Sequence, residues 1–238
     1  MDVHVRKCNH NTTMKYIRNF RKIINECIKR GWLSQDPFVR FQMSLHEVKI
    51  TPLSKIELKA ISEKKFSIER LEQVKDIFLF CCYTGLAYAD ILKLKRTDIS
   101  LGVDGQRWIF TSRKKTETPS RIPLLPFAEI IMEKYKENIK CIYNNRLLPI
   151  LSNQKMNGYL KEIADICGIK KRLTFHIARH TFATTITLNN GVPIETVSKM
   201  LGHKNLRTTQ HYAKILDMKV SDDMMLLKEK LTSEMSCG

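Results

Sequence analysis

Residues 174–190 read TFHIARHTFATTITLNN and place two histidines and an arginine within five positions. The stretch has a helical pattern, in which His176, Arg179 and His180 stand at i, i+3 and i+4 and lie on one face. Two imidazoles and a guanidinium on one face repel each other unless an anion lies opposite them. A phosphate group suits this arrangement, because arginine forms bidentate hydrogen bonds and histidine donates or exchanges protons.

Two other interpretations of this helix stay open. Histidines at i and i+4 have a zinc-binding spacing, but the glutamate of an HExxH motif is missing and Arg179 would repel a cation. The histidines can also form a hydrogen-bonded pair with a purely structural role. From these residues alone, a phosphate site is favoured first, a structural pair second and a metal site last.

His203 and Tyr212 are two further candidates. Gly202 is predicted to end a helix over about 193–200, which exposes His203 to a ligand. Tyr212 follows nine residues later in a short helix expected over about 205–212. A tyrosine hydroxyl, with an ordinary pKa of about 10, is a poor nucleophile unless neighbouring cations stabilise the phenolate. Taken alone, this tyrosine is more consistent with packing than with catalysis.

A basic hairpin is expected in the middle of the chain. Residues 107–112 (RWIFTS) and 119–125 (PSRIPLL) are strand-like, and the charged sequence RKKTET separates them. Arg113 and Lys115 are two positions apart, which would put both side chains on one face of a strand. With Arg121 close by, the hairpin is either a solvated basic turn or part of a phosphate site.

The rest of the chain is helical by pattern, so the expected fold class is mainly α with a small antiparallel β-sheet. Ser54 and Glu57 have the form of a capping box at the start of a helix. Gly31 is predicted to end an amphipathic, basic N-terminal helix, which a linker follows. Besides those above, helices are expected over about 12–30, 54–62, 68–82, 90–95, 127–140, 153–167 and 217–231.

The composition points to a polyanionic partner. At 238 residues and 43% hydrophobic residues the chain can bury a core, which excludes wholesale disorder. Lys and Arg number 41 against 24 Asp and Glu, and this formal charge of +17 suits nucleic acid or an anionic membrane. No apolar run approaches the roughly 18 residues of a membrane span. Seven cysteines without a CxxC spacing do not suit a secreted disulfide framework, so we expect a cytoplasmic protein with no membrane partner.

The order of these motifs resembles a known family. A strand lysine, then H-x-x-R-H, then L-G-H, then a tyrosine nine residues later is an order similar to that of tyrosine recombinases of the phage-integrase type. The resemblance covers about residues 51–215 and extends into residues 10–50, which resemble the end of a helical, SAM-like core-binding domain. The stretches TGLAYADILKL, RKKTETPSRIPLLP and HIARHTFATTITLNNG further resemble integrases of mobile elements in Bacteroides-type bacteria.

The resemblance implies a tyrosine recombinase catalytic fold and a role for each matched residue. Tyr212 would be the nucleophile and would form a 3′-phosphotyrosyl bond to DNA. The other implied roles are leaving-group protonation by Lys115, proton transfer by His176, phosphate binding by Arg179 and His203, and support of the site by Asp90 and His180. The covalent intermediate conserves bond energy, so no ATP, metal or other cofactor is expected.

The resemblance also implies partners and domains. The expected partner is double-stranded DNA, bound by a homotetramer that forms from monomers on two duplexes. The expected domains are a partial core-binding region over residues 1–50, a catalytic domain over 51–215 and a tail helix within 216–238. The tail would dock either on a neighbouring protomer or on its own domain. A complete core-binding domain needs about four helices, so we expect either a short gene product or a piece of a longer protein.

The sequence departs from the family at Ala87. Members usually carry the first catalytic arginine directly after Thr-Gly-Leu, and this chain has alanine there. Loss of such a contact to the transition state costs on the order of 10²–10³ in rate. Either the enzyme is impaired or another arginine reaches the phosphate, and Arg113 is the candidate. The alternative functions are therefore a DNA-binding homologue without catalysis, or nicking and closing of the type IB topoisomerase kind.

Overall fold

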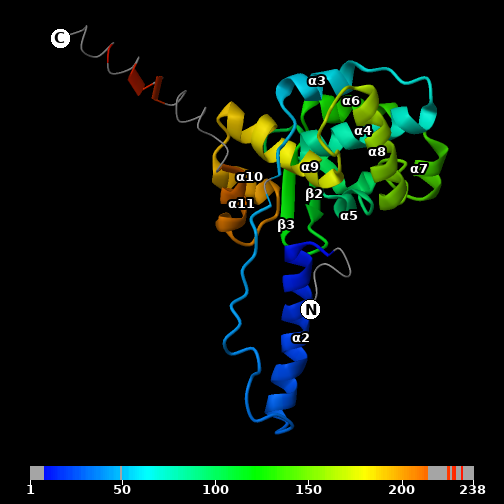
Figure 1. The fold of residues 1–238 in the computed structure, drawn as a ribbon. Coiled ribbons are helices and arrows are strands. Elements are labelled where there is room, and N and C mark those ends of the chain that lie inside the picture. Colours follow the sequence, from blue (N-terminus) through cyan, green and yellow to red (C-terminus); the bar gives the residue numbers. More distant parts are fainter. Residues whose placement is uncertain (1–7, 49, 214–223, 226, 229–231, 233–238) are drawn as a thin grey trace. The chain divides into compact units, whose positions relative to one another are not determined.

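The computed structural model describes residues 8–48, 50–213, 224–225, 227–228 and 232, and Figure 1 shows its helices and strands. The chain divides into two units, Met1–Lys49 and Ile50–Gly238, and each is described by itself. The tail helix expected over about 217–231 lies mostly outside the described residues. Within the described part of the chain, no helix is long and apolar enough to cross a membrane.

One long helix, α2 (His10–Lys29), dominates the N-terminal unit, close to the expected bounds of about 12–30. The side chain of Asn9 caps its first turn, and Gly31 follows its end with a φ of +73°, a conformation that favours glycine. The segment after the helix is irregular and returns beside it, since Asn11 and His46 exchange two side chain–backbone hydrogen bonds. Large apolar side chains of α2 stay exposed within this unit, among them Tyr16, Phe20 and Ile23.

Helix α4 (Glu69–Thr84) forms the centre of the larger unit, because nearly all of its second half is buried. The apolar run predicts such a helix over about 68–82. Three further helices pack against it, as Figure 1 shows: α6 (Pro126–Lys134), α8 (Asn153–Ile166) and α9 (Phe175–Thr181).

Gly85 ends α4 in a left-handed conformation, with a φ of +71°. A Cβ at this position would lie 2.4 Å from the Cδ1 atom of Phe182, so only glycine fits. The backbone carbonyl of Gly85 is thereby held close to the helical stretch that carries Arg179.

The shorter helices follow the predicted positions with two corrections. The capping box of Ser54 and Glu57 is confirmed, and it starts α3 (Lys55–Glu63). The helix expected at about 90–95 is wrong in its bounds, because α5 spans Tyr88–Ile91 with Ala87 as its N-terminal cap. The helix expected over about 127–140 is two helices, α6 and α7 (Ile139–Tyr143). A new helix starts at α7 because the side chain of Asn138 accepts a hydrogen bond from the N–H group of Cys141.

The two C-terminal helices of the described unit match their expected ranges. They are α10 (Ile194–Met200) and α11 (Leu206–Ala213). Gly202 follows α10 with a φ of +61°, so the predicted glycine stop is confirmed.

A three-stranded antiparallel sheet lies beside these helices in the order β1-β2-β3. The strands β2 (Arg107–Ser112) and β3 (Pro119–Pro123) form the expected hairpin, with Ile109 opposite Ile122. The third strand, β1 (Ile99–Leu101), pairs with β2 and was not predicted. The sheet packs on α10, where the hydroxyl of Ser120 donates to the carbonyl of Met200.

The connection between β2 and β3 corrects one sequence argument. Strand β2 ends at Ser112, so Arg113 and Lys115 do not share a strand face. The carbonyl of Arg113 instead accepts hydrogen bonds from the N–H groups of Thr116 and Glu117, which closes a tight turn. The physical reason is that the backbone between the strands is hydrogen-bonded as a turn, between Arg113 and residues 116–118, and not in a strand ladder.

The helical stretch expected over about 174–190 is continuous but changes its winding. After α9, residues 182–187 form a π-helical turn and residues 188–190 a 3₁₀ turn. Thr181 accepts a hydrogen bond from the N–H group of Leu53 (3.0 Å), and the hydroxyl of Thr185 donates to the carbonyl of Leu53 (2.5 Å). Two buried threonines thus hold the start of the larger unit on the helix that carries the HIARH motif.

Candidate active site

The buried guanidinium of Arg179 lies at the centre of the candidate site, with 3% of its surface exposed. Its Nη1 atom donates to the carbonyl of Gly85 (2.7 Å), and its Nη2 atom donates to the carbonyl of Leu201 (2.5 Å). These residues cap the C-terminal ends of α4 and α10. The negative end of a helix dipole favours a cation, so two helix ends together stabilise Arg179.

The charge of Arg179 is not neutralised by a carboxylate. It forms none of the salt bridges found among the described residues, and its Nε atom is buried without a hydrogen-bond partner. Burial is the main cause that lowers its pKa, and the positive charge of Arg113 lowers it further. A buried cation with an unpaired donor is a strong attractor for an anion.

His203 contacts Arg179 directly, with 3.1 Å between His203 Nε2 and Arg179 Nη2. A guanidinium only donates, so Nε2 accepts and the ring proton lies on Nδ1, which donates to the hydroxyl of Thr209 (2.8 Å). Burial, with the charges of Arg179 and Arg113, lowers the pKa of His203 to about 4. His203 is therefore neutral at pH 7 while no anion is bound.

Tyr212 on α11 is buried among these groups, with 5% of its surface exposed. Its ring lies 4.6 Å from the ring of His180 and 6.0 Å from the parallel ring of His203, measured between centroids. Burial and the charge of Arg113 lower the pKa of Arg179. Tyr212 acts in the opposite direction, because its charge and its hydrogen bond to Arg179 raise that pKa. The structure thus brings the sequence-predicted nucleophile and the sequence-predicted phosphate ligand together within one chain.

His176 and His180 form a pair on α9, with 3.1 Å between their Nε2 atoms. Burial, then the charges of His176 and Arg179, lower the pKa of His180 to about 4. Partial burial, then the charges of Arg179, Arg113 and Lys115, lower the pKa of His176. His180 is therefore neutral at pH 7, and the lowered pKa of His176 favours its neutral form as well. The expectation that the two rings lie on one helical face is confirmed.

The turn after β2 lies close to the cluster of Arg179 and the histidines. The prediction that Arg113 and Lys115 share a strand face is wrong, but both charges still reach this cluster. Arg113 is close enough to Arg179, His176 and His203 for its charge to add to the effect of burial on the pKa of each. Lys115 is exposed in the turn, and its charge reaches His176. Sequence order alone separates these two cations from α9 by some 60 positions, so only the fold shows that they meet.

Asp90 holds this turn through a hydrogen bond to its backbone. Its carboxylate is almost fully buried and accepts a hydrogen bond from the N–H group of Lys114, with 2.8 Å between Oδ1 and N. Its negative charge is also one of the smaller influences that raise the pKa of Arg179. Asp90 therefore supports the site through the backbone between Arg113 and Lys115.

Two residues of interest lie at the margin of the cluster. Arg121 is exposed on β3 and lines a groove of about 470 Å³ that His203 and Trp108 also line. Ala87, where family members carry an arginine, is half-buried and lies two residues after Gly85, whose carbonyl binds Arg179. The missing guanidinium therefore belongs to the immediate surroundings of Arg179.

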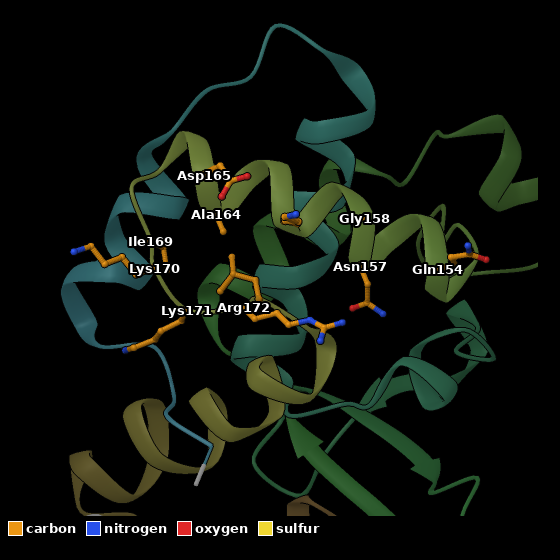
Figure 2. A pocket seen from close by; sticks show the side chains of 11 residues that line it. Gln154, Asn157, Gly158, Ala164, Asp165, Ile169, Lys170, Lys171 and Arg172 are labelled. Atoms are coloured by element: carbon orange, nitrogen blue, oxygen red, sulfur yellow. The ribbon is translucent and has the colours of Figure 1, made fainter. Parts of the chain in front are cut away.

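A separate basic pocket of about 740 Å³ lies between α8 and residues 169–173. Figure 2 shows Asn157 on α8 and the side chain of Arg172 extending toward it. The Oδ1 atom of Asn157 is buried without a hydrogen-bond partner. This pocket is not predicted from the sequence, although the basic run at 170–172 is a signal for it.

Sequence reasoning also missed the groups that hold Arg179 and His203. The carbonyls of Gly85 and Leu201 are backbone atoms, so no residue-type pattern marks them. The hydroxyl of Thr209, which accepts the Nδ1 proton of His203, lies six residues further along the chain and resembles any other threonine of a short helix.

Comparisons with known proteins define the class. The model of the Phage integrase family matches residues 56–219, and the model of the Phage integrase SAM-like domain matches residues 2–43. The first match alone spans well over half of the sequence, so the chain belongs to the phage integrase family. The expected family, fold class and enzyme class are confirmed, and the chain is a tyrosine-type site-specific DNA recombinase.

Individual relatives agree with this assignment. Tyrosine recombinase XerD of Listeria innocua serovar 6a is 27% identical over 223 residues, which cover 87% of this chain and 73% of that protein. Tyrosine recombinase XerA of Thermococcus onnurineus is 30% identical over 149 residues, which cover 58% of this chain and 50% of that protein.

Solved structures share the fold. The Tn1549 transposon integrase in complex with a circular intermediate DNA matches with a TM-score of 0.71 at 18% identity, covering 88% of this chain and 77% of that chain. A lambda integrase dimer bound to a core site matches with a TM-score of 0.64 at 19% identity, covering 81% and 69% respectively.

Proposed function

We propose that Tyr212 is the nucleophile of this recombinase and that Arg179, His203 and Arg113 bind the scissile phosphate of double-stranded DNA. One observation carries the proposal. The buried side chain of Tyr212 is close enough to Arg179 to influence its pKa by charge and hydrogen bonding, and this guanidinium has an unpaired Nε atom and no salt bridge within the described chain. An anionic phosphodiester supplies the missing charge and acceptor, and it places its phosphorus beside the tyrosine hydroxyl.

In the first step the Tyr212 oxygen attacks phosphorus and its proton leaves to a base or solvent. The bond from phosphorus to the 5′-oxygen breaks, and Lys115 donates a proton to that oxygen as it leaves. The products are a 3′-phosphotyrosyl bond and a free 5′-hydroxyl. In the second step a 5′-hydroxyl of the partner strand attacks the phosphotyrosine and restores Tyr212.

Binding of the phosphate changes the protonation of His203. A neighbouring anion favours the charged imidazolium and opposes the effects of burial, Arg179 and Arg113 that hold its pKa at about 4. With a proton on both nitrogens, His203 can keep its bond to Thr209 and donate from Nε2 to a phosphate oxygen. The substrate thereby generates one of its own cationic ligands.

Arg113 takes the role of the arginine that is absent at Ala87 in this proposal. Its charge already influences Arg179, His176 and His203, so its guanidinium lies within reach of an anion bound to them. The turn held by Asp90 keeps it there. The basic N-terminal helix over residues 10–29, the pocket of Arg172 and the surface around Arg121 supply phosphate contacts without sequence information.

The assembly and domains belong to the same proposal. We infer that residues 1–50 form a partial core-binding region, 51–215 the catalytic domain and 216–238 the tail. The active species is a homotetramer on two duplexes, formed from monomers in the cytoplasm, and it acts on the ends of a mobile element. Sedimentation of the chain with and without bound duplex checks the change from monomer to tetramer.

A covalent trapping assay tests the proposed function. Duplexes enriched from a random-sequence pool by the wild-type chain are nicked near the crossover position, so that cleavage releases a short fragment and traps the adduct. The expected result is a protease-sensitive protein–DNA adduct with the wild type and none with Tyr212→Phe, which still binds. Binding without an adduct in the wild type would show a DNA-binding module, and relaxation of supercoils without recombinants would show a nicking and closing enzyme.

A further inference from the structure

We propose that His180 is a positioning residue that fixes the tautomer of His176 and the place of the Tyr212 ring. The proposal rests on the proposed function, because the groups that it positions are the proposed nucleophile and its neighbouring imidazole. The sequence resemblance gives His180 only a supporting place, and the geometry of its two nitrogens allows a more specific assignment.

The two nitrogens of His180 have different surroundings. Its Nε2 atom lies 3.1 Å from His176 Nε2, whereas its Nδ1 atom is buried without a hydrogen-bond partner. A neutral imidazole carries one proton, so each ring of the pair has one donor and one acceptor. A short contact between two Nε2 atoms requires that one donates and the other accepts.

The buried Nδ1 atom decides the direction of this hydrogen bond. If His176 donated, the proton of His180 would lie on Nδ1 as a buried N–H without an acceptor, and such orphaned donors are rare. If His180 donates from Nε2, only an acceptor lone pair stays unpaired, which is the less unusual arrangement. His180 therefore carries its proton on Nε2, and His176 carries its proton on Nδ1.

Neighbouring charges keep the pair in this state. His176 and Arg179 face His180 from its own helix, and Tyr212 faces it from α11. Burial and the positive charge of Arg179 keep His180 neutral, so its single ring proton stays in the hydrogen bond to His176. The Nδ1–H group of His176 is then available to an incoming phosphate at the open edge of the site, beside Arg113 and Lys115.

The ring of His180 has a second contact, edge-to-face with Tyr212 at 4.6 Å between centroids and 65° between planes. An orienting group that touches both a nucleophile and the group beside it is the third member of many catalytic constellations. Two substitutions separate the two contacts. His180→Phe keeps a ring against Tyr212 without a nitrogen, and His180→Gln keeps a side-chain N–H for His176 without a ring.

Tautomers measured by long-range ¹H–¹⁵N correlation test the inference without DNA. The expected result is a protonated Nε2 in His180 and a protonated Nδ1 in His176; the reverse pattern, or averaged shifts for both rings, would overturn it. In His180→Phe the pKa of His176 should rise, because a hydrogen bond to its lone pair no longer opposes protonation. In His180→Gln it should stay near the wild-type value.

Single-turnover cleavage provides the functional test, with the exposed His211→Phe on α11 as the matched control. We expect His180→Phe to slow cleavage about 100-fold at unchanged DNA affinity, within the range known for misplaced acid–base groups. His180→Gln should recover most of that loss, and His211→Phe should cleave like the wild type. Equal rates for His180→Phe and the wild type would refute the inference, whereas a wild type without any adduct would refute the proposed function instead.

Discussion

Arg179 and His203 share a hydrogen bond of 3.1 Å between Nη2 and Nε2, in which a cation donates to a neutral imidazole. The described part of the chain offers this pair no carboxylate as a salt-bridge partner. A neutral imidazole is a weaker acceptor for a guanidinium than an oxyanion is, so a phosphate oxygen can replace His203 as the acceptor with a gain in energy. The free site therefore has the electrostatics of a site built for an anion.

The first prediction concerns the arginine missing at Ala87. Arg113→Ala should lower single-turnover cleavage roughly 10²–10³-fold, because the transition state loses one guanidinium contact. DNA binding should weaken only by the loss of about one phosphate contact, measured as the slope of affinity against salt. Lys114→Ala, an exposed neighbour in the same turn, is the matched control and should cleave normally.

A gain-of-function variant sharpens this prediction. Ala87→Arg introduced into Arg113→Ala should restore part of the cleavage, because position 87 follows two residues after Gly85, whose carbonyl holds Arg179. Normal cleavage by Arg113→Ala alone would exclude a role for that side chain.

The second prediction is a pH dependence of stability. The pKa values of His180 and His203 are about 4 in the folded chain and about 6.5 when unfolded, so between these values the unfolded state binds more protons. The free energy of unfolding should therefore be highest above pH 6.5 and fall as the pH drops toward 4. Urea titrations at pH 7, 6 and 5 measure it.

Carboxylates do not produce the same effect in this window. Burial is the largest single influence on the pKa values of Glu57 and Glu72, and it raises them. Hydrogen bonds to lysines and to backbone N–H groups together outweigh burial, so both pKa values are lowered in the folded chain. Their stabilisation is lost only below about pH 4.5. In His203→Gln the slope between pH 7 and 5 should become shallower, and an unchanged slope would contradict the assignment of this titration to the site.

The third prediction concerns the support of the turn by Asp90. Asp90→Ala removes the acceptor for the N–H group of Lys114, so the turn should open more often. Trypsin should then cut after Lys114 or Lys115 faster than in the wild type, and DNA cleavage should slow. Asp90→Asn keeps an acceptor oxygen, so its digestion rate should lie between those of the wild type and Asp90→Ala. Equal digestion rates for all three chains would show that the turn is stable without the Asp90 hydrogen bond.

The fourth prediction concerns the hydrogen bonds that Thr181 and Thr185 form with the backbone of Leu53. Thr181→Val leaves the buried N–H group of Leu53 without its acceptor, at a cost of about 1–3 kcal/mol in the free energy of unfolding. Chemical denaturation measures this loss. The exposed Thr208→Val is the control and should stay within about 0.5 kcal/mol of the wild type.

Much of the fold could be predicted because its signals are local. The capping box at Ser54, the glycine stops at Gly31 and Gly202, and the strand at 107–112 each depend on neighbouring residues. The third strand, Ile99–Leu101, could not be predicted, since three residues carry no periodicity and gain their order only by pairing with β2.

The candidate site also has features that the sequence predicts and features that only the fold shows. The residue types and order of His176, Arg179, His203 and Tyr212 are visible in the sequence, and the structure brings them together. The Gly85 and Leu201 carbonyls that hold Arg179 are not visible, because every residue has such a group. The strand alternation that predicts a role for Arg113 does not exist, and this side chain comes close to the cluster through the turn instead.

The carbonyls of Gly85 and Leu201 make the Arg179 side chain a link between two helix ends, in addition to its proposed role as a phosphate ligand. Arg179→Ala removes this link between the ends of α4 and α10, so a loss of cleavage in that variant would report on folding and on chemistry at once. Arg179→Lys is no cleaner, because a single ammonium cannot reproduce the forked geometry that meets both carbonyls. Loss of activity at this position is informative only beside a melting temperature, whereas the turn residues can be changed without loosening the core.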